Sequence, residues 1–337
     1  MRIAVVGASG YAGSEVLRLA LGHPHAEVVV ATGASTAGRR IRDHVPALAA
    51  LVGERTFAPT AEVLEADVDV AFVALPHGQS QHVVPELLER GVRVLDLGAD
   101  FRLRDADTYE RWYGHPHERP ELLGSAVYGL VERHRDELPG ARLVAVPGCY
   151  PTATSLALGP FLDAGAVERA GMVVNALSGA SGAGRSPSDR LHFPRLAANA
   201  ETYGLITHRH TPEMEQEIGG SLLFTPHLVP VSRGMLVSAY ARAREGMTTD
   251  VALGILRDRY ADEPFVVVVE EPPTMKDPVG SNLCFVSARV DPRTGWLLAM
   301  SSIDNLLKGA AGQAIQAWNV AEGWGETLGL PLTGVTP

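Results

Sequence analysis

Lysine is almost absent from this sequence. Lys276 and Lys308 are its only lysines, so arginine supplies nearly all of the 29 basic residues, and 39 acidic residues outnumber them. A net charge of −10 without a long basic run excludes nucleic acid as the expected partner, because binding to a phosphate backbone needs a concentrated positive surface. A few arginines can still form a local site for an anion, so we expect a small-molecule substrate.

Cysteine is equally scarce, and long apolar runs are missing. Cys149 and Cys284 are too few for a disulfide scaffold or a cysteine-rich zinc site, and we expect no metal. The N-terminal residues lack the pattern of a signal peptide, and no uncharged run reaches the roughly 18 apolar residues of a membrane helix. The 337 residues therefore predict a cytoplasmic globular protein of about two domains, without a membrane partner.

The first half of the chain alternates short apolar runs with amphipathic segments. Near-continuous apolar strands between helices predict a parallel sheet that is covered on both faces. We therefore expect an α/β fold that begins with a Rossmann-type, doubly wound domain over residues 1–148. Its strands are expected at 2–7, 27–33, 69–76, 92–98 and 142–148, and its helices at 14–24 and 80–91.

The pattern changes after Cys149. A helix is expected at 151–165, and strand-like runs separated by Gly/Pro/Arg loops then predict a mostly antiparallel α+β domain over 149–303. A last helix is expected at 304–325. The strands of this second domain are expected at 171–179, 221–231, 234–244, 264–272, 282–290 and 295–302.

Glycines stand between the first expected strand and the first expected helix. Gly7, Gly10 and Gly13 let the backbone turn tightly, so that the amides of the helix N-terminus can face the phosphates of a dinucleotide. The spacing is GxxGxxG instead of the more common GxGxxG, and the alternative is a plain strand–helix turn. Its position directly after an N-terminal strand favours a dinucleotide. The residues between the glycines that we expect at the cofactor are Ser9, Tyr11 and Ala12.

The end of the second expected strand indicates which dinucleotide is bound. NAD sites usually place an acidic residue there for the ribose hydroxyl, but this segment contains none. Ser35, Thr36, Arg39 and Arg40 supply hydroxyls and positive charge that suit a 2′-phosphate, which favours NADP(H). The alternative is that these arginines are solvated loop residues.

Cys149 is the candidate nucleophile. It follows a buried-type strand and precedes a helix, where the positive end of the helix dipole favours the reactive thiolate. Cys284 lies inside an apolar strand and fits the more common role of a buried structural cysteine.

The segment 207–213 offers an acid/base partner. It gathers His208, Arg209, His210 and Glu213, with a helix start at Thr-Pro-Glu. We expect His210 just before this helix as the acid/base, oriented by Glu213, although His208 remains an alternative. A metal site formed by the two histidines is disfavoured, because no third ligand is evident.

Two further segments suggest anion recognition. The Gly/Ser loop at 178–185 exposes backbone amides that could form an anion-binding nest, and it ends in Arg185. A flexible loop tip is the plainer alternative. Arg102, which follows the strand at 92–98, is another candidate.

Taken together, the motifs resemble the N-acetyl-γ-glutamyl-phosphate reductase family over nearly the whole chain. The resemblance implies a Rossmann domain and an α+β semialdehyde-dehydrogenase-type domain for substrate and oligomerisation, with the helix at 304–325 returning to the cofactor domain. The motifs are GASGYAGSE (7–15), ALPHG (74–78), DLGADFR (96–102), VYGLVE (127–132), PGCYPT (147–152), SGASGAGR (178–185), HRHTPEM (208–214), FTPHLVPVSRG (224–234) and SSIDNLLKGAAGQAIQ (301–316).

The resemblance also implies a reaction, namely NADPH-dependent reduction of an acyl phosphate to an aldehyde in arginine biosynthesis. Cys149 would form a thioester, and His210 would give a proton as the thiohemiacetal collapses. A homodimer or homotetramer is expected. Further cofactor contacts are expected at Pro76, His77, Ser178, Gly179, Asn305 and Lys308, and substrate contacts at Arg102, Ser181, Arg185, His208, Arg209 and Glu213.

Rival functions remain. An aspartyl-phosphate reductase fits the SGASGAGR and HRHTPE segments less well. An N-modified aminoadipyl-phosphate reductase of lysine biosynthesis differs by one methylene, which is worth only about 1–3 kcal/mol in a pocket. A non-enzymatic NADP-binding regulator would not need both Cys149 and the HRH segment. No tyrosine is followed four residues later by lysine, which excludes a short-chain dehydrogenase, and no GxxxxGK[ST] kinase loop occurs.

Overall fold

The computed structural model describes residues 1–335 and divides into two compact units. Unit 1 contains Met1–Pro147 and Ala310–Leu330, and unit 2 contains Gly148–Gly309 and the residues from Pro331 onward. The chain therefore leaves unit 1 after Pro147 and returns to it at Ala310. Each unit is described by itself.

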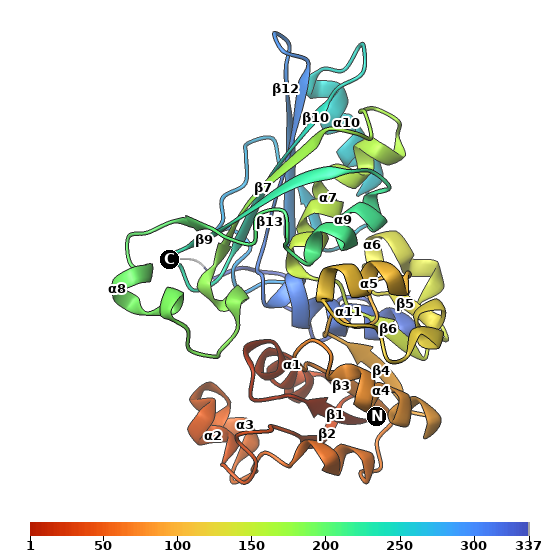
Figure 1. Cartoon of the computed structure of the whole chain (residues 1–337), viewed down its shortest axis with the longest axis vertical. Coiled ribbons are helices and arrows are strands. Elements are labelled where there is room, and N and C mark those ends of the chain that lie inside the picture. Colours follow the sequence, from red (N-terminus) through yellow and green to blue (C-terminus); the bar gives the residue numbers. More distant parts are fainter. Residues whose placement is uncertain (336–337) are drawn as a thin grey trace. The chain divides into compact units, whose positions relative to one another are not determined.

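Unit 1 is built on a six-stranded sheet with the order β2-β1-β3-β4-β6-β5, in which all pairs are parallel (Figure 1). Apolar side chains on both faces of β1 and β3 are buried, as predicted from their uninterrupted apolar runs. The edge strand β5 was not predicted. The strands are β1 (Arg2–Val6), β2 (Glu27–Ala31), β3 (Val70–Val73), β4 (Arg93–Asp96), β5 (Ala126–Tyr128) and β6 (Leu143–Ala145).

Helices cover this parallel sheet. The apolar face of α1 packs against β1 and β2, while α4 packs against β3 and β4. The helices of unit 1 are α1 (Tyr11–Gly22), α2 (Ile41–His44), α3 (Ala49–Val52), α4 (Ser80–Glu89), α5 (Ala106–Tyr113), α6 (Val131–His134) and α11 (Gly312–Ala321). The short 3₁₀ segments are η1 (Pro46–Leu48), η2 (Thr60–Leu64), η3 (Pro120–Ser125) and η4 (Arg135–Glu137).

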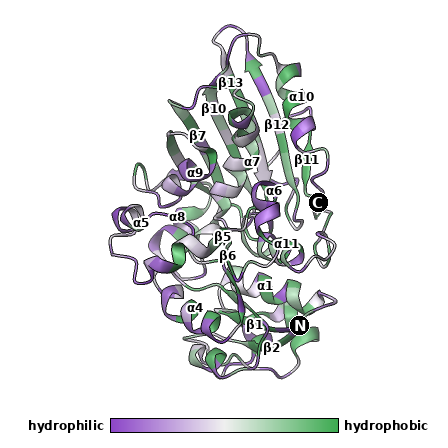
Figure 2. Ribbon diagram, turned by 90° about the vertical axis from the view of Figure 1, so that its right-hand side faces the viewer, coloured by the Kyte–Doolittle hydropathy of each residue, from purple (hydrophilic) through white to green (hydrophobic). Residues whose placement is uncertain are grey.

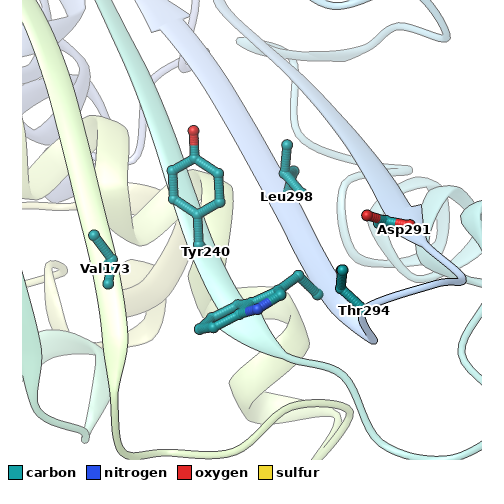
Figure 3. Close-up of a pocket in the computed structure, with 6 residues that line it drawn as sticks. Val173, Tyr240, Asp291, Thr294 and Leu298 are labelled. Atoms are coloured by element: carbon teal, nitrogen blue, oxygen red, sulfur yellow. The ribbon is translucent and has the colours of Figure 1, made fainter.

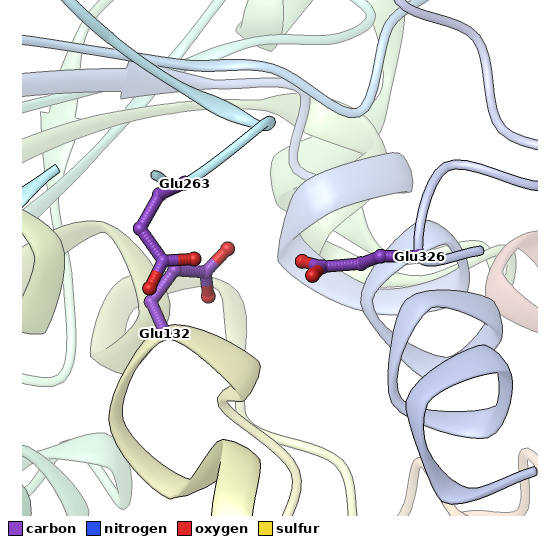
Figure 4. Close-up of side chains that lie close together, drawn as sticks. All are labelled: Glu132, Glu263 and Glu326. Carbon is purple, nitrogen blue, oxygen red and sulfur yellow. The ribbon is translucent and has the colours of Figure 1, made fainter. Parts of the chain in front are cut away.

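Buried amides fasten α11 in unit 1. The Gln313 side chain donates to the Gly129 carbonyl at 2.7 Å. Gln316 Nε2 donates to carboxylates of Glu132 at 2.9 Å and Glu326 at 2.7 Å, the two unit 1 residues drawn in Figure 4. Because an amide satisfies both carboxylates, this buried polar cluster fixes the rotation of the helix.

Unit 2 contains a seven-stranded mixed sheet with the order β11-β12-β13-β10-β7-β9-β8. The β7–β9 and β11–β12 pairs are parallel and the other pairs are antiparallel, so the prediction of a mostly antiparallel sheet holds. The strands are β7 (Met172–Gly179), β8 (Glu201–Thr202), β9 (Leu222–Val229), β10 (Met235–Arg242), β11 (Val266–Val268), β12 (Cys284–Asp291) and β13 (Trp296–Ile303).

Only one face of this sheet is covered. Figure 1 shows α7 and α10 along one side of the strands, and α7 packs on β10 and β13. Residues of β7 and β10 accordingly alternate between buried and half-buried, which is the pattern of a half-covered sheet. The helical segments are α7 (Cys149–Asp163), η5 (Ala180–Ala183), η6 (Asp189–Leu191), α8 (Phe193–Leu196), α9 (His210–Ile218), α10 (Thr249–Arg259) and the π-helical turn η7 (Leu307–Ala311), which ends in unit 1.

An apolar row crosses the open face. Tyr240 on β10 pairs with Val173 on β7 and with Leu298 on β13, and Val173 pairs with the exposed Leu223 on β9. Figure 3 shows Val173, Tyr240 and Leu298 on adjacent strands, where they help to line a cavity of about 310 Å³. The hydropathy colouring in Figure 2 likewise marks much of these strands as hydrophobic.

Candidate active site

The glycine loop of unit 1 is packed too tightly for side chains. Gly7 has a φ of +78°, and a Cβ placed on it would lie 2.4 Å from the Ala74 carbonyl oxygen. A Cβ on Gly13 would lie 2.2 Å from the Gly7 oxygen. Helix α1 begins at Tyr11, earlier than predicted, with Gly10 as its N-cap. The loop therefore brings bare backbone to a helix N-terminus, the arrangement that a pyrophosphate needs.

The end of β2 also fits a nucleotide. Thr36 Oγ1 is buried and has no hydrogen-bond partner within residues 1–335. Ser35 and Arg39 are exposed beside it. Arg40, by contrast, forms an ion pair with Asp43 at 2.8 Å, so this guanidinium is engaged on the protein surface.

Two contacts to the glycine loop were not predicted. Thr32 Oγ1 accepts the Gly7 amide at 3.1 Å. His44 Nε2 lies 3.0 Å from the Ser9 carbonyl oxygen, which requires the imidazole to donate from Nε2. Both residues therefore hold the loop from outside the glycine motif, and no motif in the sequence marks them.

The loop after β3 is held by Asp100. Its carboxylate accepts the Gly78 amide at 2.8 Å, the Ser80 hydroxyl at 2.7 Å and the Tyr109 hydroxyl at 2.8 Å. Burial alone would raise the pKa of Asp100, but these hydrogen bonds outweigh it and lower the pKa. Pro76 and His77, the predicted cofactor contacts, are exposed on this loop.

Asp96 lies beside Asp100 and titrates differently. It is fully buried, and its two oxygens accept the Gly98 amide at 2.9 Å and the Ser80 hydroxyl at 3.2 Å. Burial, followed by the charge of Asp100, raises the pKa of Asp96 to about 7. A proton on Asp96 therefore lets Ser80 bridge one neutral and one ionised carboxyl group.

In unit 2, Cys149 is the first residue of α7 and is partly exposed, whereas Cys284 is fully buried in β12. Gly148, the N-cap of α7, donates a hydrogen bond from its amide to Glu213 Oε1 at 2.9 Å. Glu213 is itself 1% exposed, so this carboxylate fixes the turn that presents the sulfur. The substrate contact of Glu213 stays a prediction. In the structure, its carboxylate anchors the turn at Gly148.

The backbone at Gly309 packs closely against Cys149. A Cβ on Gly309 would lie 2.7 Å from the Cys149 Cβ, so this position admits only glycine without a shift. Gly148 and Gly309 are also the residues at which the chain enters and leaves unit 2. The candidate nucleophile therefore directly follows the residue at which the chain first enters unit 2.

His210 begins the neighbouring helix, and His208 lies in the loop just before it. His210 is the first residue of α9, which packs against α7. Its amide donates to His208 Nδ1 at 3.2 Å, so His208 carries any neutral-ring proton on Nε2. The Tyr150 ring lies 5.4 Å from the His208 ring and 5.8 Å from the His210 ring, with Tyr150 immediately following the nucleophile. The geometry thus brings the predicted nucleophile and the predicted bases to adjacent helix starts.

The second glycine-rich loop corrects a prediction. The amides of Gly179, Ala180 and Ser181 donate to the carbonyls of Gly234, Val231 and Ser232. These three amides are therefore unavailable for an anion nest, because the loop continues the pairing of β7 instead of standing free.

Asn305 joins the same two segments. Its Oδ1 accepts the Gly234 amide at 2.8 Å and its Nδ2 donates to Ser181 Oγ at 3.0 Å. Ser178 is 2% exposed, and its hydroxyl is directed toward the Gly179 carbonyl at 3.2 Å. The cofactor contacts of Ser178, Gly179 and Asn305 stay predictions, and in the structure these residues hold the loop in place.

The remaining predicted contacts are the four basic residues Arg102, Lys308, Arg185 and Arg209, which differ in burial. Arg102, in unit 1, is 8% exposed and donates to the carbonyls of Val146 at 2.8 Å and Leu97 at 2.9 Å, while its contact with substrate stays a prediction. Lys308 is fully buried in unit 2, with its ammonium 5.7 Å from the centre of the Phe265 ring. Arg185 and Arg209 are exposed.

No helix within residues 1–335 combines the length and apolar character required to traverse a bilayer.

Two family models match the chain in succession. The model described as "Semialdehyde dehydrogenase, NAD binding domain" matches residues 2–141, and the one described as "Semialdehyde dehydrogenase, dimerisation domain" matches residues 149–305. Aspartate semialdehyde dehydrogenase II from Vibrio cholerae has a TM-score of 0.71 over 96% of this chain and 98% of that chain, at 17% identity. The Candida albicans aspartate semialdehyde dehydrogenase, solved with NADP, has a TM-score of 0.68 over 95% and 98%, at 15% identity. The predicted fold is confirmed.

Relatives found by sequence are more similar to this chain, at 44–47% identity, than these solved structures are. The N-acetyl-gamma-glutamyl-phosphate reductase of Symbiobacterium thermophilum is 47% identical over 343 residues, which cover 99% of this chain and 98% of the relative. The protein of the same name from Magnetococcus marinus is 44% identical over 348 residues, which cover 100% of this chain and 99% of the relative.

Proposed function

The chain belongs to the N-acetyl-gamma-glutamyl-phosphate reductase family, and from this premise we propose that it reduces N-acetyl-γ-glutamyl phosphate to N-acetylglutamate 5-semialdehyde with NADPH, releasing phosphate, in arginine biosynthesis. The observation that carries the proposal is the position of Cys149 at the first residue of α7, beside a helix that begins at His210. A partly exposed thiol at a helix N-terminus, next to imidazoles, suits acyl transfer through sulfur.

The residues around the glycine loop suit NADP(H). The bare backbone of Gly7 and Gly13 would admit the pyrophosphate, and the unsatisfied Thr36 hydroxyl with the exposed Arg39 would bind the 2′-phosphate. When bound, NADPH supplies the hydride that reduces the thioester.

Cys149 performs the covalent step. Its thiolate attacks the acyl carbon, a carbon–sulfur bond forms, and the bond from that carbon to the phosphate oxygen breaks. Backbone amides at the N-terminus of α7 would stabilise the oxyanion that develops at the acyl carbon. Glu213 fixes the Gly148 turn, which keeps these amides aligned.

His210 moves the proton. It accepts the proton of the Cys149 thiol before attack and returns a proton to the oxyanion formed after reduction. The imidazole takes that proton back as the thiohemiacetal collapses, the carbon–sulfur bond breaks, and the aldehyde leaves with thiolate restored. His208, held through its Nδ1, is the alternative for this role.

A second copy of this chain would cover the open sheet face. The matched dimerisation domain and the apolar row around Tyr240 support a symmetric dimer, or a tetramer that contains such a dimer. Antiparallel strands facing a two-fold axis would bury Tyr240 of both copies.

The reverse reaction tests the function. NADPH formation is followed by absorbance with N-acetylglutamate 5-semialdehyde and phosphate, and parallel reactions contain aspartate semialdehyde, the aldehyde longer by one methylene, or NAD. We expect phosphate-dependent turnover with the N-acetylglutamyl aldehyde and NADP. Preference for the longer aldehyde would move the enzyme to lysine biosynthesis, and tight NADP binding without any turnover would leave a non-enzymatic regulator.

A further inference from the structure

Arg190 was not singled out by any motif, yet its guanidinium is incompletely satisfied. It lies in η6, between β7 and α9, with its guanidinium carbon 4.4 Å from the centre of the Tyr203 ring. Its Nε is 3.2 Å from Glu201 Oε1. Even so, Nε and Nη2 are buried and make no hydrogen bond to any part of the chain that the structure describes. Buried donors without acceptors cost about 1–3 kcal/mol each, which an incoming oxyanion would recover.

A tyrosine pair links Arg190 to the nucleophile. The hydroxyls of Tyr203 and Tyr150 are 2.8 Å apart, and Tyr150 directly follows Cys149. Burial is the main cause that raises the pKa of Tyr203 to about 12; the charge of Cys149 adds to the rise, while the hydrogen bond with Tyr150 and the charge of Arg190 oppose it. Arg190 is therefore connected to the residue that follows Cys149 through two successive contacts, its stacking on Tyr203 and the Tyr203–Tyr150 hydrogen bond.

The local charge leaves room for one anion. Glu201 interacts with two arginines, Arg190 at 3.2 Å and Arg195 at 3.5 Å, so the three side chains sum to one positive charge. Arginine presents its donors in a planar fork that matches a carboxylate. The rings of Tyr203 and Tyr150, which connect this fork to the residue after Cys149, offer apolar surface that would suit a short methylene chain.

We propose that Arg190 binds the α-carboxylate of the substrate and thereby selects N-acetylamino-acid substrates over uncharged analogues. The proposal rests on the proposed function, since that function supplies a substrate with a carboxylate at one end and the reacting carbonyl carbon at the other. Phosphate is the less suitable occupant, because it must lie next to the acyl carbon at Cys149 and not across the tyrosine pair.

The test compares an aldehyde with and without the carboxylate. Phosphate-dependent NADPH formation is measured with N-acetylglutamate 5-semialdehyde and with 4-acetamidobutanal, which differ only in that group. We expect Arg190→Gln to lower kcat/KM for the carboxylated aldehyde by about 10- to 100-fold, the worth of a charged hydrogen bond, and to leave 4-acetamidobutanal within about twofold. Arg190→Lys should retain part of the preference, because it keeps the charge and loses the fork.

Arg195→Gln is the matched control. Arg195 shares Glu201 with Arg190 but is more exposed, so its loss should lower the preference for the carboxylated aldehyde far less than Arg190→Gln does. Equal losses of kcat/KM with both aldehydes in Arg190→Gln would assign Arg190 a structural role and overturn the proposal. A raised KM for phosphate with an unchanged aldehyde preference would also overturn it.

A binding experiment separates this proposal from the proposed function. Calorimetry compares N-acetylglutamate with 4-acetamidobutanoate, and the wild type should bind the former more tightly by a margin that Arg190→Gln removes. If the wild type turns over neither aldehyde but keeps this Arg190-dependent margin, the reductase function is rejected and the carboxylate site stands. If the margin is absent, or persists in Arg190→Gln, the carboxylate site is rejected.

Discussion

The parallel sheet of unit 1 is buried on both faces, whereas the mixed sheet of unit 2 is covered on one. Residues 70–73 of β3 are all buried, while β7 and β10 alternate between buried and half-buried positions. A sheet covered on both faces can meet a ligand only at its edges and strand ends, which is where the loop at Gly7 lies. A half-covered sheet keeps a whole face for a partner, and the candidate catalytic residues Cys149 and His210 are the first residues of helices in this unit.

The largest effect should come from the nucleophile. Cys149→Ser is expected to lower phosphate-dependent turnover by about a thousandfold or more, because an alcohol is a far weaker nucleophile than a thiolate. NADP affinity, measured by fluorescence titration, should stay within about twofold, since that site belongs to the other unit. Cys284→Ala is the control and should retain activity, because Cys284 is buried in β12. Near-normal turnover by Cys149→Ser would rule out the thioester mechanism.

The open face should show the next largest effect. Tyr240→Asp places a charge in the apolar row. Both copies of a symmetric dimer carry this charge at their interface, so we expect the dimer dissociation constant to rise about 100-fold. Light scattering over a dilution series measures it. Val251→Asp, at a half-exposed position on α10, is the control and should not change the mass. If only the control dissociates the protein, the interface is elsewhere.

A smaller effect is expected at the edge of the unit 1 sheet. Gly13→Ala would put a methyl group 2.2 Å from the Gly7 carbonyl oxygen, so the loop must shift, and NADP should bind about tenfold more weakly. Titration of NADP against the variant measures this. Gly22→Ala, where a Cβ meets nothing within 4 Å, should bind NADP as the wild type does. Wild-type affinity in Gly13→Ala would show that the cofactor does not approach this loop.

The remaining prediction concerns the pH dependence of stability and belongs to unit 1. Since burial raises the pKa of Asp96 from 3.8 to about 7, the folded protein holds a proton that the unfolded chain releases. Stability should therefore fall as pH rises from about 4 to about 7, by at most about 1.4 kcal/mol per pH unit, and level off above that. Asp96→Asn removes this loss, so its denaturation midpoint should rise relative to the wild type across the window. Parallel pH profiles would contradict a raised pKa.

The sequence predicted what depends on neighbouring residues. Apolar runs located the strands at Ile3 and Phe72, and the turn before Cys149 located the start of a helix within two residues. Strand β5 was missed because Ala126–Tyr128 is short, lies at the sheet edge and is only partly buried, so it lacks an apolar run.

Contacts between distant segments could not be predicted. Small residues suggested that the amides of the loop at Gly179 and Ser181 would be free, but Asn305, 124 residues beyond Ser181, ties this loop to the segment at Gly234. The same holds for Arg190, whose aromatic partner Tyr203 follows an unremarkable loop. The sequence shows which polar groups are present, whereas the fold determines which of them form hydrogen bonds or aromatic contacts.

The interruption of unit 1 has a consequence for how the protein is made. Gly129 and Glu132 contact Gln313 and Gln316 of α11, 184 residues later, and unit 2 lies between them in the sequence. At about 5–20 residues per second, a ribosome takes on the order of ten seconds to synthesise the intervening unit. Throughout that time the buried carboxylate of Glu132 lacks its amide. Unit 1 is therefore begun before unit 2, and its last helix is added only after residues 148–309 of unit 2 have been synthesised.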